Sequence, residues 1–420
     1  MTPRTPSSVA LFAGGCMTLA SLGFSAGAQA EGFVEDANFS LNLRNFYINR
    51  NFVDSDYPQS KGEEWTQSFI LNFQSGYTPG PVGFGVDALG LLAVKLDGGG
   101  GTYGTGLLPV HGAPGDRHPP DDFARLAVAA KAKFSETEVR VGEWMVVLPI
   151  LRSDDGRSLP QTFQGGMITS KEIKGLSLYG GQMRQNSPRD DGSMDDMFYG
   201  GVSSDRFNFV GGEYELGART KVGAWHARLE DIYQQNYFQL LHTQPLGEGV
   251  ALTANLGYFT GKEEGSALAG DLDNKTYSGL FGLQLGGNTF YVGLQKVSGD
   301  NGWMRVNGTS GGTLANDSFN SSYDNPNERS WQLRHDYNFA GMGVPGLTIM
   351  NRYISGDRIE AGGVDDGKEW GRESELAYTV QSGPLKSLNI KWRNSSIRRD
   401  YSTTEFDENR LIFNYPLSLL

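Results

Sequence analysis

The chain has 420 residues and a formal net charge of −12, with 58 glycines and a single cysteine. Its acidity disfavours nucleic-acid binding, which requires a basic surface. A single cysteine excludes an internal disulfide framework, so the folded chain must gain its stability in another way.

The amino-terminal segment predicts a secretory signal peptide. Arg4 gives a positive start, residues 9–24 form an apolar run, and small residues precede a cleavage point after Ala30. Cys16 leaves a lipoprotein open as an alternative, although the apolar run continues beyond it. No later apolar stretch is long enough to predict a membrane-spanning helix. We therefore expect a signal peptide at 1–30 and a single mature domain at 31–420.

Apolar and polar residues alternate with period two along the mature chain. The alternating segments run for about eight to twelve residues and carry aromatic residues near their ends, which is typical of strands that cross a bilayer at a tilt. The clearest of them are residues 41–47, 65–73, 252–258, 276–285, 331–339 and 411–417.

Two kinds of connection separate these predicted strands. Turn residues form short connections at 76–83, 284–288, 338–346 and 380–387. Longer polar connections are predicted at 299–329 and 355–372. Outer-membrane barrels have short turns at one end and long loops at the other, and the chain length predicts an even number of strands near eighteen.

A soluble all-β protein is the structural alternative, since its strands also alternate. A propeller would show an internal repeat of about forty residues, which we do not find. Soluble strands are also shorter, at about five or six residues. We therefore predict an all-β fold, a transmembrane antiparallel β-barrel of about 18 strands.

The stretch LNIKWRN, residues 388–394, shows how such strands are oriented. Ile390 and Trp392 share one face, and Lys391 and Arg393 share the other. A cation facing lipid at the bilayer midplane costs about 2–4 kcal/mol. Lys391 and Arg393 are therefore expected to face an aqueous lumen.

The same parity argument predicts further cations inside the barrel. Cations that line a low-dielectric wall focus the electric field and raise the local concentration of anions. The alternative is that they are lumen charges paired with neighbouring acids, and we favour that reading for Arg334, Lys131 and Lys133. The remaining inward cations are Arg44, Arg140 and Arg352.

Several stretches resemble the OprD family of outer-membrane porins. They are ANFSLNLRNFYINRNF (37–52), LPILRSDDGRSLPQTFQGG (148–166), LEDIYQQNY (229–237), ERSWQLRHDYNFAGMGVPGLTIMNRYISGD (328–357), VQSGPLKSLNIKWRN (380–394) and ENRLIFNYPLSLL (408–420). The resemblance implies an eighteen-stranded barrel, a monomer or weak homotrimer, in the outer membrane of a Gram-negative bacterium. It also implies an inward-folded constricting loop and a ladder of basic residues on one wall, which we expect to be Arg44, Arg140, Arg352, Lys391 and Arg393.

Residues 148–166 are the expected constricting loop. Asp154, Gln161, Thr162 and Phe163 are expected near the narrowing, although an anchoring role for the LPQTF segment is equally compatible with the sequence. By resemblance to a second inward loop, Asp324 is the expected carboxylate facing the ladder, with Tyr323 beside it.

No residue pattern predicts catalysis. The sequence shows no nucleophile elbow or phosphate-binding loop, and we expect no enzyme activity, no metal and no cofactor. The expected function is passive diffusion of small carboxylate-bearing nutrients, with aromatic or cyclic acids favoured over basic amino acids. The expected partners are the solute, the lipid bilayer and lipopolysaccharide, and no nucleic acid. A structural or adhesive barrel, or an outer-membrane hydrolase, is the alternative.

Overall fold

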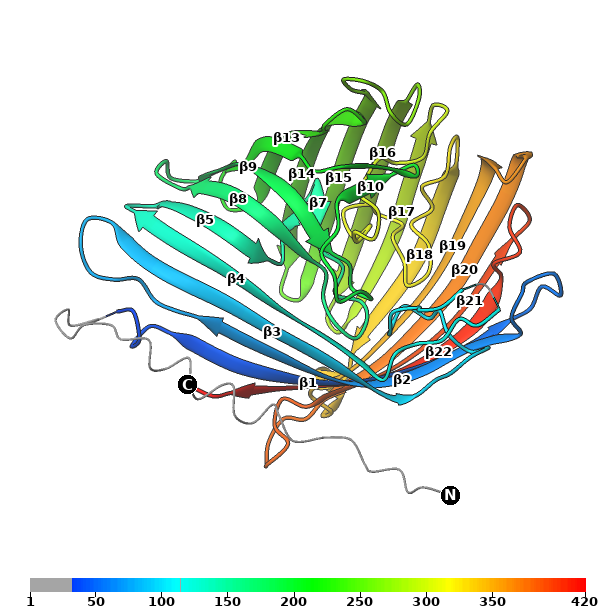
Figure 1. Ribbon diagram of the computed structural model, residues 1–420, viewed down its shortest axis with the longest axis horizontal. Coiled ribbons are helices and arrows are strands. Elements are labelled where there is room, and N and C mark those ends of the chain that lie inside the picture. The colour runs from blue at the N-terminus through cyan, green and yellow to red at the C-terminus, as the bar shows by residue number, and fades with distance from the viewer. Residues whose placement is uncertain (1–31, 114) are drawn as a thin grey trace, which may run out of the picture.

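The chain folds into a closed antiparallel barrel of 18 strands, as the alternation predicted (Figure 1). The computed structural model describes residues 32–113 and 115–420. The first barrel strand pairs with the last, from Ser40 opposite Ser418 to Phe52 opposite Phe406, and this pairing closes the barrel. The predicted signal peptide lies outside the described residues.

The barrel strands follow one another in chain order around the sheet. They are β1 (Asn38–Phe52), β2 (Lys61–Gln74), β3 (Gly83–Asp97), β4 (Asp122–Phe134), β5 (Thr137–Trp144), β8 (Thr162–Ser170), β9 (Leu176–Ser187), β12 (Phe207–Glu215), β13 (Thr220–Leu229), β14 (Tyr233–Gly247), β15 (Val250–Glu263), β16 (Asp273–Leu285), β17 (Asn288–Ser298), β18 (Arg329–Asn338), β19 (Leu347–Ala361), β20 (Val364–Thr379), β21 (Asn389–Arg399) and β22 (Phe406–Ser418).

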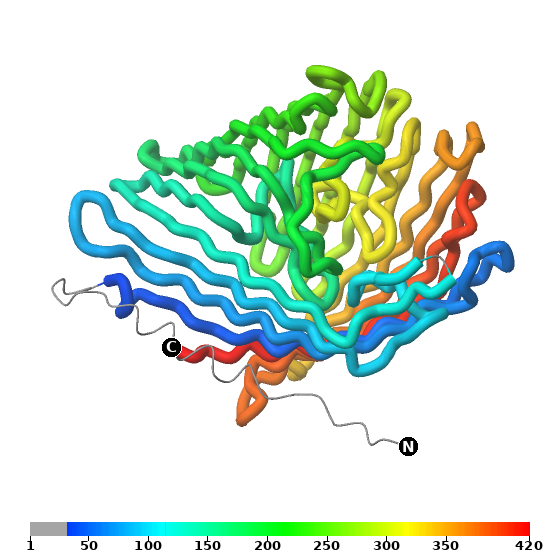
Figure 2. Tube along the Cα trace, viewed as in Figure 1, coloured from blue at the N-terminus to red at the C-terminus, as the bar shows by residue number. Residues whose placement is uncertain are grey.

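The long loops lie at one end of the barrel and several fold into it. We name four of them L2 (98–121), L3 (145–161), L4 (188–206) and L7 (299–328). Loop L3 contains the hairpin of β6 (Val147–Leu148) and β7 (Leu151–Arg152), and L4 contains that of β10 (Met197–Tyr199) and β11 (Val202–Ser204). Figure 2 shows L4 in green and L7 in yellow inside the ring of strands.

A 3-10 helix, η2 (Phe339–Met342), forms part of the short turn between β18 and β19. Within residues 32–113 and 115–420, no helix combines the length and apolarity that spanning a membrane demands.

One predicted connection was wrong. Residues 355–372 were expected to form a long polar loop, but they are the paired ends of β19 and β20. The strands continue to a turn at Gly362 and Gly363, whose φ angles of 62° and 82° suit glycine. The acidic stretch GVDDGKE, residues 363–369, has the composition of a loop because a strand that extends beyond the membrane carries polar residues on both faces.

Side-chain exposure alternates along the strands as parity requires. In β21, Trp392 is 46% exposed on the outer face, and the next inward side chain, Arg393, contacts loop L7 inside the barrel. In β16, Tyr277 is exposed while Thr276 and Ser278 are buried. The outer face is therefore mainly apolar and aromatic, with the exposed Arg372 of β20, which donates to Asn394, as an exception, and polar groups line the lumen.

The interior is asymmetric. A large apolar cluster fills the side of the lumen next to β8–β15. In it, Trp144 at the end of β5, Leu148 of L3, Met197 of L4 and Trp303 of L7 pack against inward aromatic residues of the wall. This packing leaves the charged side, β19–β22 and β1, to border the remaining aqueous space.

Candidate functional site

Seven cations project inward from four strands, β19, β21, β22 and β1, and we call this surface the basic wall. Three lie on β21, in the order Arg399, Arg393 and Lys391 from the loop end to the turn end of the strand. The whole set is Arg352 of β19, Lys391, Arg393 and Arg399 of β21, Arg410 of β22, and Arg44 and Arg50 of β1. The wall thus offers cationic groups at successive depths along the bore.

Four glutamates of the same wall pair with these cations. Their ion pairs, with the shortest nitrogen–oxygen distances, are Arg352–Glu373 (2.5 Å), Arg393–Glu375 (2.5 Å), Lys391–Glu375 (4.0 Å), Arg399–Glu369 (2.8 Å), Arg50–Glu408 (2.7 Å) and Arg410–Glu408 (2.6 Å). Because the cations outnumber these glutamates, the wall keeps a positive field while each guanidinium is held in a fixed orientation.

Side-chain contacts anchor loop L3 to the inner faces of β1 and β2. The Arg44 guanidinium pairs with Asp155 at 2.8 Å and donates to the Arg157 carbonyl at 2.7 Å. Thr66 of β2 and Ser158 of L3 share a hydrogen bond of 2.8 Å. These contacts hold L3 inside the barrel as predicted, although residues 162–166 of the predicted constricting loop belong to strand β8.

Arg157 itself is a buried cation without a carboxylate partner among the described residues. Its guanidinium donates only to main-chain carbonyls, those of Thr105 and Gly156. Burial lowers the pKa of Arg157 well below its usual value, and the nearby charges of Arg410 and Arg189 lower it further. An anion that reached Arg157 would therefore relieve both the desolvation and the repulsion.

Loop L7 covers the middle of the basic wall with one aromatic ring. The ring centroid of Phe319 lies 4.1 Å from the guanidinium carbon of Arg393, 5.0 Å from that of Arg352 and 5.7 Å from that of Arg410. The Phe319 amide donates to Glu373, and Arg410 donates to the Phe319 carbonyl. Three guanidiniums of the basic wall are thus paired with glutamates of the wall and covered on the lumen side by the Phe319 ring.

The two inward loops also contact each other. The Ser310 amide of L7 donates to the Arg152 carbonyl of L3 at 2.9 Å, and the Thr313 hydroxyl donates to the Pro149 carbonyl at 2.9 Å. Together L3 and L7 narrow the lumen between the basic wall and the apolar cluster.

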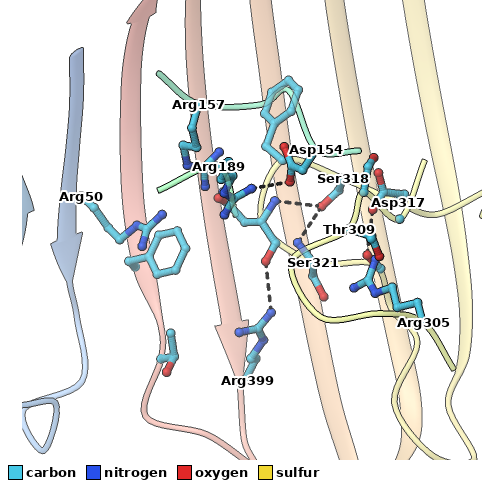
Figure 3. Close-up of a pocket in the computed structure, with 18 residues that line it drawn as sticks. Arg50, Asp154, Arg157, Arg189, Arg305, Thr309, Asp317, Ser318, Ser321 and Arg399 are labelled. Carbon is cyan, nitrogen blue, oxygen red and sulfur yellow. Dashed lines mark hydrogen bonds and ion pairs between the residues drawn. The ribbon is translucent and has the colours of Figure 1, made fainter. Parts of the chain in front are cut away.

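A cavity of about 390 Å³ lies between these loops and the wall (Figure 3). Arg50, Arg157 and Arg189 lie on one side of it and Arg305 on the other, and Arg399 completes the cationic lining. The cavity's acids are Asp154, which pairs with Arg189, and Asp317.

Asp317 is half-buried at the edge of this cavity. Burial raises its pKa to about 6, although the Ser322 hydroxyl, which donates to it at 2.7 Å, and the charges of Arg305 and Arg352 act in the opposite direction. The cavity is therefore lined by five arginines, one paired carboxylate and one carboxyl whose ionised form is disfavoured.

The structure brings four of the five predicted ladder residues together on the basic wall, namely Arg44, Arg352, Lys391 and Arg393. Arg140 lies apart on β5, where it pairs with Asp87 and Glu138. Two other inward cations form ion pairs with neighbouring acids, as the sequence suggested for them. Lys131 pairs with Asp87 at 2.7 Å, and Arg334 pairs with Asp336 at 2.7 Å.

The predicted constriction residues occupy different environments. Asp154 lines the cavity. Gln161, Thr162 and Phe163 are fully buried, with Gln161 donating to Asn186 and Thr162 to Glu143. These contacts correspond to the anchoring role that the sequence left open.

The two residues expected near the constriction on loop L7, Tyr323 and Asp324, also lie in different environments. Tyr323 is buried, with 1% of its surface exposed, and adopts a left-handed φ of 51°. Asp324 pairs with Arg305 at 3.4 Å, so its carboxylate is directed at a loop cation rather than at the basic wall.

Sequence reasoning missed several residues of the site. Parity alone would have identified Arg50, which shares a face with Arg44, and Arg399, which shares one with Arg393. Arg410 is the inward neighbour of the exposed Leu411 and was equally detectable. Phe319, Arg189 and Arg305 lie in loops, where no periodicity indicates direction.

A closed barrel with an apolar outer face and a charged lumen narrowed by its own loops defines an outer-membrane porin. A family model described as outer membrane porin, OprD family, matches residues 31–419. The chain belongs to this family of channels, which places it in the outer membrane of Gram-negative bacteria.

The porin-like protein GalP of Pseudomonas putida is 65% identical over 398 residues, 94% of this chain and 95% of that protein. The crystal structure of a BenF-like porin from Pseudomonas fluorescens is 66% identical, with a TM-score of 0.91, covering 92% of this chain and 100% of that one.

Two solved relatives contain carboxylates. Pseudomonas aeruginosa OccK2 in complex with glucuronate is 59% identical, with a TM-score of 0.85 and coverage of 93% and 100%. Pseudomonas aeruginosa OpdK with vanillate is 47% identical, with a TM-score of 0.87 and coverage of 92% and 100%.

Proposed function

We propose that this protein is a passive channel for small carboxylate-bearing nutrients and prefers aromatic or cyclic acids to basic amino acids. Arg44, Arg352, Lys391 and Arg393 act as a basic ladder, extended by Arg50, Arg399 and Arg410 on the same wall. Arg140 provides a separate cationic step on β5. The positive field draws the carboxylate inward, and successive sites bind it weakly enough to release it.

The observation that carries this proposal is the cavity lined by five arginines, among them the buried Arg157, whose charge no carboxylate neutralises among the described residues. A solute carboxylate supplies the missing counter-charge. Planar bidentate pairing with guanidinium is the strongest arrangement available to it.

The preference for acids over basic amino acids follows from the cavity carboxylates. Asp154 is occupied by Arg189, and the pKa of Asp317 is raised by burial. The ammonium group of a basic amino acid would therefore meet only Asp317 as an unpaired carboxyl, against the five arginines of the cavity lining. The glucuronate and vanillate complexes of OccK2 and OpdK support the same direction, since both ligands are cyclic acids.

The test is uptake into liposomes that contain the purified protein, with vanillate, glucuronate, benzoate and arginine as solutes. We expect vanillate and glucuronate to enter faster than arginine at equal gradients. Arg157→Gln should slow the acids by roughly tenfold, the loss of one charge-assisted hydrogen-bonded contact, and Arg157→Lys should retain part of the rate.

The matched control is Arg219→Gln, which removes one exposed arginine in the turn between β12 and β13, away from the cavity. It should leave all four rates unchanged. Equal loss in both variants, or faster entry of arginine than of any acid, would contradict the proposal.

A further inference from the structure

The outer face of the barrel carries a row of cations just beyond its aromatic residues. Each of five adjacent strands carries one exposed cation near its long-loop end, and we call this set the outer basic arc. Its members are Lys275 of β16, Lys296 of β17, Arg329 of β18, Arg358 of β19 and Lys368 of β20. The five strands stand side by side in Figure 1.

The arc lies where a membrane surface would be. Lys275, Arg329 and Lys368 each lie two residues closer to the long loops than an exposed aromatic residue of the same strand. These aromatic residues are Tyr277, Trp331 and Trp370. Residues two apart share a face of a strand. Since aromatic girdles mark the boundary of the hydrocarbon in outer-membrane barrels, the cations lie at the level of lipid head groups.

Repulsion between neighbouring cations of the outer basic arc destabilises the sheet unless an anion lies between them. Lys296 and Arg329 stand directly opposite each other on the outer face of β17 and β18. Like charges in directly opposite positions destabilise a sheet. Asp357 pairs with Arg329 at 2.8 Å, but among the described residues no ion pair involves Lys275, Lys296, Arg358 or Lys368.

A β-bulge turns Arg358 toward the same place. The pairing of β19 with β20 shifts register between Gly356 and Ile359, and Arg358 adopts a left-handed φ of 63°. Bulges re-aim side chains, and a left-handed arginine is held only at a cost. Arg358 thereby lines a surface groove of about 540 Å³ together with Lys296 and Arg329.

Three carboxylates also border this groove, those of Glu360, Asp365 and Asp366. They belong to the tip of the β19–β20 hairpin, beyond Arg358 along the chain and farther from the aromatic residues. The part of the groove that adjoins the membrane surface is therefore its cationic part.

We propose that the outer basic arc binds the phosphate groups of a phosphorylated glycolipid of the lipid A type in the outer leaflet. Phosphate oxygens match the arc in charge, and basic clusters at a bilayer surface select anionic lipids. The acyl chains lie against the apolar strand faces below Tyr277 and Trp331. This site is separate from the channel lumen.

The test compares two triple variants of the full-length protein purified in detergent. Lys275→Gln with Lys296→Gln and Lys368→Gln removes three lysines of the arc. Lys171→Gln with Lys174→Gln and Lys386→Gln removes three exposed lysines from short turns at the other end of the barrel. Native mass spectrometry with added lipid A, and with lipid A stripped of its phosphates, measures the lipid retained by each protein.

We expect the affinity for lipid A to fall roughly fivefold for each arc lysine replaced. The turn variant should bind lipid A like the native protein, and stripped lipid A should bind all three proteins weakly and equally. Both triple variants should keep the native single-channel conductance, which verifies their folding.

Three results would overturn the proposal. They are equal loss of lipid A from both triple variants, full retention by the arc variant, and binding of stripped lipid A as tight as that of lipid A. A second protein copy that dissociates in the arc variant while lipid binding stays constant would instead assign the arc to self-association.

Discussion

Arg393 and Phe319 form a contact between the wall and the loop that narrows the channel. The guanidinium carbon of Arg393 lies 4.1 Å from the ring centroid of Phe319, and its Nε donates to Glu375 at 2.5 Å. A single loop ring therefore covers a ladder cation that is already paired with an acid behind it.

Replacing Phe319 with Ala should open the middle of the basic wall. The change removes three cation–π contacts, each worth about 0.5–1 kcal/mol, and exposes Arg352, Arg393 and Arg410 to the bore. We expect higher single-channel conductance, stronger anion selectivity and larger current fluctuations in planar bilayers. Phe319→Leu is the control, since it keeps most of the volume and loses the ring. If both variants conduct like the native channel, Phe319 does not limit the bore.

Removing Lys391 and Arg393 together should weaken the ladder. The double change to Ala leaves Glu375 without its partners, so the local field becomes negative, and we expect carboxylate uptake to fall by roughly tenfold. A triple variant that adds Glu375→Gln should recover part of this rate. Uptake can be measured by swelling of liposomes. Unchanged entry of every carboxylate tested would refute a transport role for this pair.

Loop L7 should be most firmly closed in mild acid. Burial raises the pKa of Asp317 to about 6 from an ordinary value of 3.8, so the folded loop binds a proton that the open loop releases. This contribution is fully present below pH 3.8 and is lost as the pH rises through about 6, a difference of about 3 kcal/mol. After correction for the intrinsic, base-catalysed exchange rate, the amides of residues 310–322 should therefore be more protected at pH 5 than at pH 8.

The matching variant is Asp317→Asn, which keeps the shape of the side chain and removes its titration. Residues 310–322 of this variant should exchange at the same intrinsic-corrected rate at both pH values. An Asp317→Asn protein with the native pH dependence would assign that dependence to another group.

A charge introduced on the outer face should lower the free energy of unfolding more, the closer it lies to the middle of the membrane. Leu333 is exposed on the lipid side of β18, and Leu333→Lys should lower the free energy of unfolding by about 2–4 kcal/mol. Ser298→Lys, at the long-loop end of β17, should change it by less than about 1 kcal/mol. Urea unfolding in lipid vesicles, followed by tryptophan fluorescence, measures both values. Similar costs at the two sites would contradict the assigned membrane boundary.

The alternation of side chains along each strand could predict many of the cations of the basic wall. Arg44, Arg352, Lys391 and Arg393 were identified because each alternates with an apolar or aromatic neighbour. Arg410 obeyed the same rule and was overlooked. Parity states which face of a strand a residue occupies but gives no position around the barrel. For this reason Arg140 was grouped with cations at least four strands away.

The sequence by itself determined the architecture of this protein, because period-two alternation and the cost of placing charge in lipid act on each strand separately. The tertiary structure alone decided what the lumen contains. Loops L3 and L7 have no repeating pattern, and their course depends on long-range contacts such as Arg44–Asp155 and the guanidiniums around Phe319. Such contacts join residues more than a hundred positions apart or from several strands at once, so only the closed barrel brings them together.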